Sequence, residues 1–287
     1  MEIVRRKESH VERTAAEPRE SEIHSVTLSR IDRVSDSIRV FRLGIQEGST
    51  IKFLPGQWLD TFVPGVKKPG GFTITSQPSK ACLPTSPYLE LAVQKAPSNP
   101  AAAWLWDMAH VGSYLHVRVG GAFVWPPQGV DLTSLRRVVF VAAGVGVNPF
   151  MSILSHLAEA ECSFDLRFLY SIKAPEDLGA KKMLFVERLR TIYGLGKVRG
   201  RLQLFLTGAG LDHDDSALPC NETKSTLESR RMTLNDVYDA LGPKDEHKFA
   251  VVYLCGPPSM IDEFAAKLTS PDESGLDPRQ VLCERWW

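Results

Sequence analysis

The sequence predicts an antiparallel β-barrel in the first half of the chain, followed by an α/β domain built on a parallel sheet. Three observations support this fold class. Short β-rich runs divided by proline and glycine fill residues 23–125, apolar strands alternate with helical stretches over residues 136–287, and the connecting segment WPPQGVDLTSL is rich in proline and glycine. At 287 residues the chain is long enough for two such domains.

The first half carries strand signals almost throughout. Apolar residues alternate with polar ones, and the pattern is interrupted by turns at Pro55-Gly56 and Pro64-Gly65. Ala101–Met108 is the one stretch of this half that predicts a helix. The predicted strands lie in Val26–Asp32, Ile38–Leu43, the segment between the two turns, and the runs GFTITS, YLELAVQK and SYLHVRVGG.

The second half alternates compact apolar strands with helical stretches, which is typical of a parallel sheet covered on both faces. The predicted strands are Val138–Ala143, Asp165–Tyr170, Leu202–Leu206 and Phe249–Leu254. The predicted helices are Pro149–Ala160, Ala180–Tyr193, Leu234–Leu241 and Met260–Leu268. Residues 208–233 are polar and without a pattern, so we expect a surface insertion there.

Charge and cysteine content exclude several classes of function. The 34 basic and 34 acidic residues balance, which argues against binding to nucleic acid or to an anionic membrane, and no apolar run reaches the roughly 18 residues of a membrane span. Five scattered cysteines without a C-x-x-C pair predict free thiols in a reducing, intracellular compartment and no metal site. Residues 1–22 are highly charged and lack an apolar stripe, which predicts a disordered leader.

A glycine turn follows the first strand of the second half, in the stretch VFVAAGVGVNPFMSIL. The turn residues are Gly144, Val145, Gly146, Val147, Asn148 and Pro149. Glycine lets a phosphate approach the main chain, the helix that follows offers unpaired N–H groups, and proline suits the first helical position. The turn therefore predicts a pyrophosphate site. Taken alone the pattern is weak, and a strand–helix turn without a ligand stays open as an alternative.

A second turn of the same kind lies about 110 residues later, in VVYLCGPPSMIDEF. The apolar strand ends at Cys255, and the turn and the start of the next helix contain Gly256, Pro257, Pro258 and Met260. Because the carboxyl ends of parallel strands share one edge of a sheet, we expect the two glycine turns to lie side by side there.

With both turns in place, residues 24–287 resemble the ferredoxin–NADP reductase superfamily. That resemblance implies a flavin-type barrel that binds FAD, followed by a Rossmann-like domain that binds NAD, with NADP left open. It also implies that Cys255 lies by the nicotinamide, that Glu284 lies near the nicotinamide edge, and that an aromatic residue near the end of the chain, such as Trp287, covers the flavin. Simple packing of Cys255 and of Trp287 stays open as an alternative. A mitochondrial location is implied as well, with the cytosol left open as an alternative.

The family's flavin signature, Arg-x-Tyr-Ser, aligns with Gly70-Gly71-Phe72-Thr73. By this resemblance Phe72 packs on the flavin ring and the Thr73 hydroxyl faces the reactive nitrogen, with Ile74, Thr75 and Ser76 beside them. Gly70 lacks the family's arginine, and losing such a contact weakens binding about 10–150-fold. Ala102 likewise stands where the family has a phosphate-binding serine, and Lys67 and Lys68 are candidate replacements for the missing charge.

Two functions follow. In the first, NAD(P)H passes hydride to the flavin, and the flavin reduces an unknown external acceptor, either a small molecule or a protein. Thr73, Cys255 and Glu284 are then the candidate catalytic residues. In the second, the barrel has lost its flavin, and the protein binds a nicotinamide nucleotide as a sensor or scaffold. Gly70 favours the second function, and the retained residue types at Phe72 and Thr73 favour the first.

Overall fold

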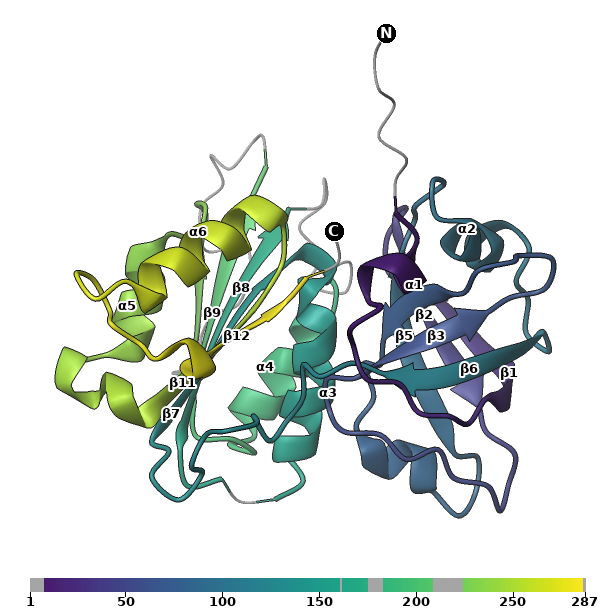
Figure 1. Ribbon diagram of the computed structural model, residues 1–287, viewed down its shortest axis with the longest axis horizontal. Coiled ribbons are helices and arrows are strands. Elements are labelled where there is room, and N and C mark those ends of the chain that lie inside the picture. The colour runs from purple at the N-terminus through teal and green to yellow at the C-terminus, as the bar shows by residue number, and fades with distance from the viewer. Residues whose placement is uncertain (1–7, 161, 175–182, 209–223, 286–287) are drawn as a thin grey trace, which may run out of the picture.

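The computed structural model describes residues 8–160, 162–174, 183–208 and 224–285. Within them the chain forms an antiparallel sheet and a parallel sheet that stand side by side (Figure 1), so the predicted fold class is confirmed. All strands of the antiparallel sheet lie within residues 24–120, and all strands of the parallel sheet lie within residues 137–284. No helix in these ranges is both long enough and apolar enough to cross a bilayer.

The antiparallel sheet curls into a barrel. Its strand order is β4-β3-β6-β1-β2-β5, and a bridge between Ile74, just after β4, and Leu91 in β5 brings the two edges together. The interior is filled by fully buried residues such as Leu28, Phe41 and Val117. The strands are β1 (His24–Arg33), β2 (Ile38–Gly44), β3 (Trp58–Phe62), β4 (Gly70–Thr73), β5 (Tyr88–Gln94) and β6 (Tyr114–Gly120), and helix α2 (Pro100–Asp107) follows β5.

The parallel sheet has the order β10-β9-β8-β7-β11-β12, with the first strand of the domain in its interior. Residues 138–142 of β7 are 0% exposed, as expected for a strand covered on both faces. The strands are β7 (Arg137–Ala143), β8 (Asp165–Lys173), β9 (Gly200–Thr207), β10 (Ser225–Glu228), β11 (Ala250–Cys255) and β12 (Val281–Glu284).

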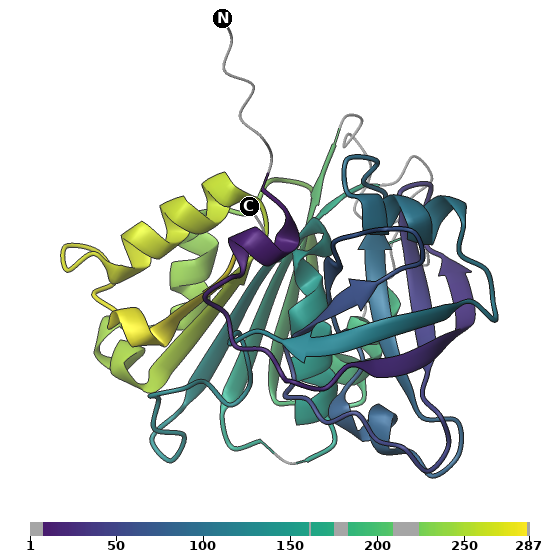
Figure 2. The same cartoon turned by 45° about the vertical axis from the view of Figure 1, so that its right-hand side comes forward.

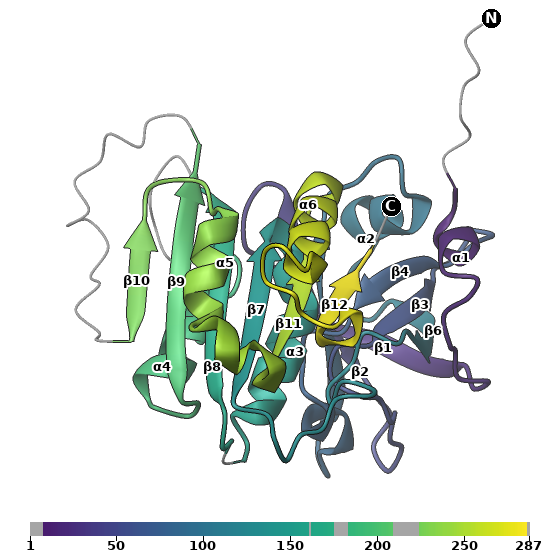
Figure 3. The same ribbon diagram turned by 60° about the vertical axis from the view of Figure 1, so that its left-hand side comes forward.

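Helices cover both faces of the parallel sheet (Figure 3). Helices α3 and α4 share one apolar core, on the side of the barrel, and α5 and α6 share the other. The helices are α3 (Asn148–Leu157), α4 (Val186–Gly194), α5 (Leu234–Leu241) and α6 (Pro258–Thr269). Leu234–Leu241 matches its predicted bounds, and the other three overlap the predicted ranges.

Two edge strands were missed. Both are only four residues long, and STLE in β10 lies within the 208–233 stretch that we expected to be without a pattern. The strand forms because it pairs with β9, and its own sequence carries no strand signal. Residues 209–223 of the same stretch lie outside the described ranges. Strand β12 pairs with β11 and places Glu284 next to Cys255.

The prediction of a disordered leader over residues 1–22 was wrong for residues 8–22. Helix α1 (His10–Arg13) packs beside β4, and Arg19 bridges to Gly120 at the end of β6. The His10 ring lies edge-on to Trp58, with ring centroids 4.7 Å apart. Figure 2 shows the segment running along the front of the barrel with α1 facing the parallel sheet. Residues 1–7 lie outside the described ranges.

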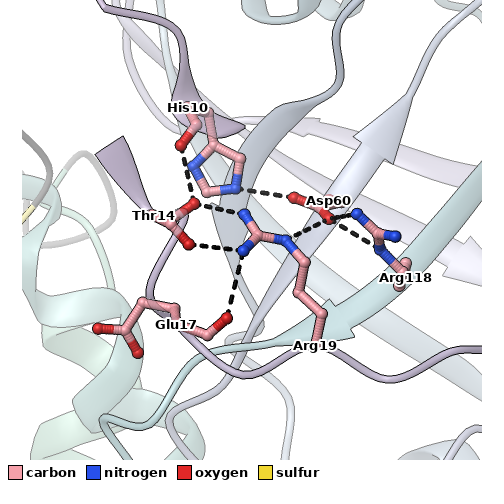
Figure 4. Close-up of polar contacts among 6 residues, drawn as sticks. All are labelled: His10, Thr14, Glu17, Arg19, Asp60 and Arg118. Carbon is pink, nitrogen blue, oxygen red and sulfur yellow. Dashed lines mark hydrogen bonds and ion pairs between the residues drawn. The ribbon is translucent and has the colours of Figure 1, made fainter. Parts of the chain in front are cut away.

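Two basic side chains of this segment, His10 and Arg19, contact a buried carboxylate (Figure 4). Asp60 of β3 is 0% exposed, and it accepts hydrogen bonds from His10 Nε2 at 2.9 Å, Arg19 Nε at 3.0 Å and Arg118 Nη2 at 2.6 Å. Burial alone would raise the pKa of Asp60, but these three donors outweigh burial and hold the pKa at about 2. Through His10 and Arg19 the buried Asp60 thus ties the segment to the barrel, a contact that composition does not reveal.

Hydrogen bonds between side chains and backbone fix the two domains against each other. Asn148 Nδ2 at the start of α3 donates to the Ala92 carbonyl in β5 at 2.9 Å, and Ser152 Oγ donates to the Ser76 carbonyl at 2.8 Å. The Tyr253 hydroxyl of β11 donates to the Val124 carbonyl at 3.0 Å. The carboxyl ends of β7 and β11 are thereby held facing the barrel.

Candidate functional site

The two glycine turns are in direct contact. A 3₁₀ turn over Gly144–Val147 joins β7 to α3, and a Cβ added at Gly146 would lie 2.3 Å from the Cys255 carbonyl oxygen and 2.8 Å from the Gly256 nitrogen. Only glycine permits such an approach. Gly144 has a φ of +56° and open space on the side where a Cβ would be, so its backbone is exposed to the cavity beside it.

A cavity of about 530 Å³ lies between these turns and the barrel. One side of the cavity is formed by the ends of β7 and β11, and the barrel side by β4, β5 and the start of α2. The cavity therefore brings together two sets of predicted site residues that are far apart in the sequence. The lining residues that the sequence predicted are Phe72, Thr73, Gly144, Val145, Gly146, Asn148, Cys255, Gly256 and Pro257.

The other predicted site residues lie outside this lining. Ile74, Thr75 and Ser76 are buried at the domain boundary, where the Thr75 hydroxyl donates to Glu90 at 2.9 Å. Four others belong to the turns or to the helices that follow them and do not line the cavity: Val147 ends the first turn, Pro149 lies in α3, and Pro258 and Met260 lie in α6. Trp287 lies outside the described residues.

The position of the missing arginine is closed. A Cβ added at Gly70 would lie 2.6 Å from the Ala101 Cβ and 2.9 Å from the Phe72 ring, so no longer side chain fits there without moving α2. Position 71 is covered as well, because a Cβ there would meet the His10 ring at 2.1 Å. The two glycines thus let α1 and α2 pack tightly onto β4.

The groups that could replace the missing arginine are the start of α2, Lys68 and Lys67. The first two already have hydrogen-bond or ion-pair partners, and Lys67 lines a neighbouring cavity. Asn99 caps α2, and its Oδ1 accepts from the amides of Ala101 and Ala102 at 3.1 and 3.2 Å, which satisfies the helix end that the family offers to phosphate. Lys68 forms an ion pair with Glu12 at 2.9 Å. Lys67 lines an adjoining cavity of about 670 Å³ that reaches Gly70 and Asn99.

Burial disfavours the charged forms of two groups at the strand ends. Burial, assisted by the adjacent Glu284 carboxyl, raises the pKa of the Cys255 thiol well above 9.0. Burial first, and the charge of Glu17 second, raise the pKa of Glu284 well above 4.5. Burial therefore favours the un-ionised thiol of Cys255 in the cavity wall and the protonated form of Glu284, which lies beside Cys255 but outside the cavity lining.

The chemistry of the lining fits a dinucleotide and a flavin. Gly144 leaves open space beside its backbone, and the close contact of Gly146 with the Cys255 carbonyl brings the second turn next to that space, which suits a diphosphate. Asn148 uses its Nδ2 on the barrel, but its Oδ1 is buried without a partner and is free to accept a hydrogen bond from a ligand. Phe72 offers an apolar ring and Thr73 a hydroxyl at the opposite wall.

Sequence comparison places the chain among known proteins. No protein-family model matches it. Oxidoreductase NAD-binding domain-containing protein 1 from Danio rerio is 32% identical over 291 residues, covering 99% of this chain and 99% of that protein. The chain belongs to the oxidoreductase NAD-binding domain-containing protein 1 family. Outside this family, the reductase component of propane 2-monooxygenase from Rhodococcus jostii is 25% identical over 264 residues, covering 90% of this chain and 62% of that protein.

Solved structures show the same fold as this member of the oxidoreductase NAD-binding domain-containing protein 1 family. A ferredoxin NADP⁺ reductase from Neisseria gonorrhoeae, solved with bound FAD and NADP, superposes with a TM-score of 0.65 at 18% identity, covering 92% of this chain and 99% of that one. The cytochrome b5 reductase domain of Ulva prolifera nitrate reductase superposes with a TM-score of 0.63 at 16% identity, covering 92% and 97%. The resemblance to the ferredoxin–NADP reductase superfamily is thereby confirmed at the level of the fold.

Proposed function

We propose that this protein is an NAD(P)H-dependent flavin oxidoreductase, which moves a hydride from NAD(P)H to bound FAD and passes the electrons to an external acceptor. One observation carries the proposal: a single cavity has the flavin-signature residues Phe72 and Thr73 on one wall and the contacting turns at Gly146 and Gly256 on the other. A cavity between two domains, lined by apolar groups with a few polar ones, is the usual form of a cofactor site.

The residues present assign a side of the cavity to each cofactor. Phe72, Thr73 and Asn99 on the barrel side would hold the flavin, and the backbone at Gly144 and Gly146 would hold the diphosphate of the nicotinamide nucleotide. The bound flavin supplies the redox chemistry, because it accepts two electrons as hydride and releases them to a second substrate. The protein supplies alignment, exclusion of water and proton placement.

Alignment comes from the rigid contacts around the cavity. Cys255 is 1% exposed and small, so it leaves room for two flat rings to approach each other beside the end of β11. Its protonated thiol adds no charge that would oppose hydride movement. Asn148, which also lines the cavity, is fixed by its bond to Ala92, and its buried Oδ1 has no partner.

Glu284 is placed to handle a proton. It sits at the end of β12, directly opposite Cys255 in the parallel pairing, and burial raises the pKa of its carboxyl. A buried acid with a raised pKa is able to donate a proton to a reduced product and to regain it from solvent. We propose this role in proton delivery for Glu284, which lies beside Cys255 just outside the cavity lining.

The acceptor in our proposal is a separate partner protein or a small molecule. The support is the similarity to the reductase component of propane 2-monooxygenase, whose name makes it one part of a larger system. For the donor we favour NADH, with NADPH open. Lys173 at the end of β8 is exposed near the expected ribose position, while Glu176 and Asp177 lie outside the described residues.

One feature favours the alternative, a nicotinamide-binding protein without flavin. Gly70 and the capped end of α2 remove both of the phosphate contacts that the superfamily resemblance implies. The two functions are separated by adding FAD to the purified protein, removing unbound FAD by gel filtration, and recording the visible spectrum. We expect oxidised-flavin bands that remain with the protein and NADH-dependent reduction of an artificial acceptor. Tight NADH binding with no retained flavin and no reduction would support the alternative instead.

A further inference from the structure

The N-terminal segment carries an arginine into the cofactor cavity. Among the described residues that line the 530 Å³ cavity, Arg13 is the one with a charged side chain, and the rest are apolar or neutral. Arg13 also lines the adjoining cavity that contains Lys67 and Gly70, so its side chain stands where the two cavities meet. It belongs to α1, which packs on β4, the strand that carries the flavin signature.

The hydrogen bonding of Arg13 is incomplete. Its Nη1 donates to the Glu8 carbonyl oxygen at 3.0 Å, while its Nε is buried and has no partner. A buried N–H donor without an acceptor is costly, so the arrangement favours a ligand that brings an acceptor oxygen. Because guanidinium groups bind phosphate oxygens through two parallel hydrogen bonds, a phosphate is the ligand group that fits best.

The rest of the segment holds Arg13 in this place. Asp60 takes the hydrogen bonds of His10 and Arg19 from either side of Arg13, and the Arg19 guanidinium also reaches the Thr14 carbonyl, as Figure 4 shows. The neighbouring basic groups are thus committed to the barrel. Arg13 is the basic side chain of residues 8–20 that faces the cavity, and the anchors on both sides restrict where its guanidinium lies.

We propose that Arg13 binds the diphosphate of FAD, and so replaces the arginine that is missing at position 70. This inference rests on the proposed flavin function. The replacement is consistent with glycine at both positions: Gly70 makes room for α2 and leaves no space for an arginine there, while Gly71 lets α1 lie on β4 and supply the cation from a different part of the chain. It also gives the N-terminal segment a role in cofactor binding.

The test compares three variants of the full chain. Arg13→Gln removes the charge, Arg13→Lys keeps it, and Arg30→Gln is the matched control, since Arg30 is exposed on the barrel and pairs with Asp32. FAD is titrated into flavin-free protein, followed by flavin fluorescence, at low and at high salt, and NADH is titrated separately. We expect Arg13→Gln to weaken FAD binding about 10–150-fold, Arg13→Lys to recover part of it, and Arg30→Gln to match the wild type.

Two further readouts separate phosphate binding from a structural role. The FAD affinity of the wild type should fall with salt more steeply than that of Arg13→Gln, because a charged contact is screened, while NADH affinity and the unfolding midpoint of the flavin-free protein should stay unchanged. Wild-type affinity for FAD in Arg13→Gln would overturn the inference alone, as would a loss of NADH rather than FAD affinity. A wild-type protein that binds no FAD would overturn the proposed function together with it.

Discussion

The contact between the glycine turns makes Gly146→Ala a sharp test of the site. The added Cβ would lie 2.3 Å from the Cys255 carbonyl oxygen, whereas ordinary contacts begin near 3.4 Å, so the two turns must separate by about 1 Å. Both partners are backbone atoms, and no side-chain rotation relieves the clash. Overpacking of this kind costs about 1–3 kcal/mol, and we expect the upper end because neither turn is free to move.

A loss of about 3 kcal/mol corresponds to a fall of about 6–12 °C in the unfolding midpoint of a domain of this size. The separated turns would also lose at least one charge-assisted hydrogen bond to the diphosphate, which weakens NADH binding about tenfold or more. Differential scanning fluorimetry measures the first effect, and calorimetric titration of NADH measures the second.

Gly48→Ala is the matched control. Gly48 lies in an exposed loop with no atom within 4 Å of the added Cβ, and unlike Gly146 it has a positive φ, +81°. We expect only the left-handed backbone strain, about 1–2 kcal/mol, and unchanged NADH affinity. If Gly146→Ala keeps wild-type stability and wild-type NADH affinity, the turns are not in contact, and the argument that they form one site fails.

Two other substitutions test the buried acids. Asp60→Asn should lower the free energy of unfolding at pH 7 by about 2–5 kcal/mol in denaturant melts, and it should make residues 8–20 accessible to protease. In the wild type, the contribution of Asp60 to stability should be lost as the pH falls from 3.8 towards about 2, because the carboxylate then takes up a proton. Because the pKa of Glu284 is raised on folding, the free energy of unfolding of the wild type should fall as the pH rises above 4.5. Glu284→Gln should remove this part of the pH dependence. If the variant keeps the pH dependence of the wild type, Glu284 is ionised in the folded protein.

The elements that the sequence predicted best are those with a strong local signal. The apolar run of β7 and the amphipathic pattern of α5 each specify their own structure, and the glycine turns were placed correctly because strand, glycine and helix follow one another. The missed strands β10 and β12 are short edge strands whose order comes from a neighbour. Local pattern carries no information about such pairing.

The site was predictable in part for the same reason. Phe72 and Asn148 lie in recognisable patterns and line the cavity. Arg13 lies in no recognisable pattern, because its neighbours are charged residues typical of a solvated tail. Its role becomes visible only in the structure, where α1 packs beside β4. A usable signal is Asp60: an acidic residue inside a predicted barrel strand needs hydrogen-bond donors or cations beside it, and Arg19 and the His10 ring supply two of them from the N-terminal segment.

The most direct measurement for the account as a whole is anaerobic rapid mixing of the FAD-loaded protein with NADH, followed by the absorbance of the oxidised flavin. The account predicts that the flavin bands bleach in a single turnover, and that NADH deuterated at the transferred position bleaches them more slowly. Flavin that stays oxidised with saturating NADH, and equally with NADPH, would contradict the claim that the cavity between the barrel and the glycine turns holds both cofactors in contact.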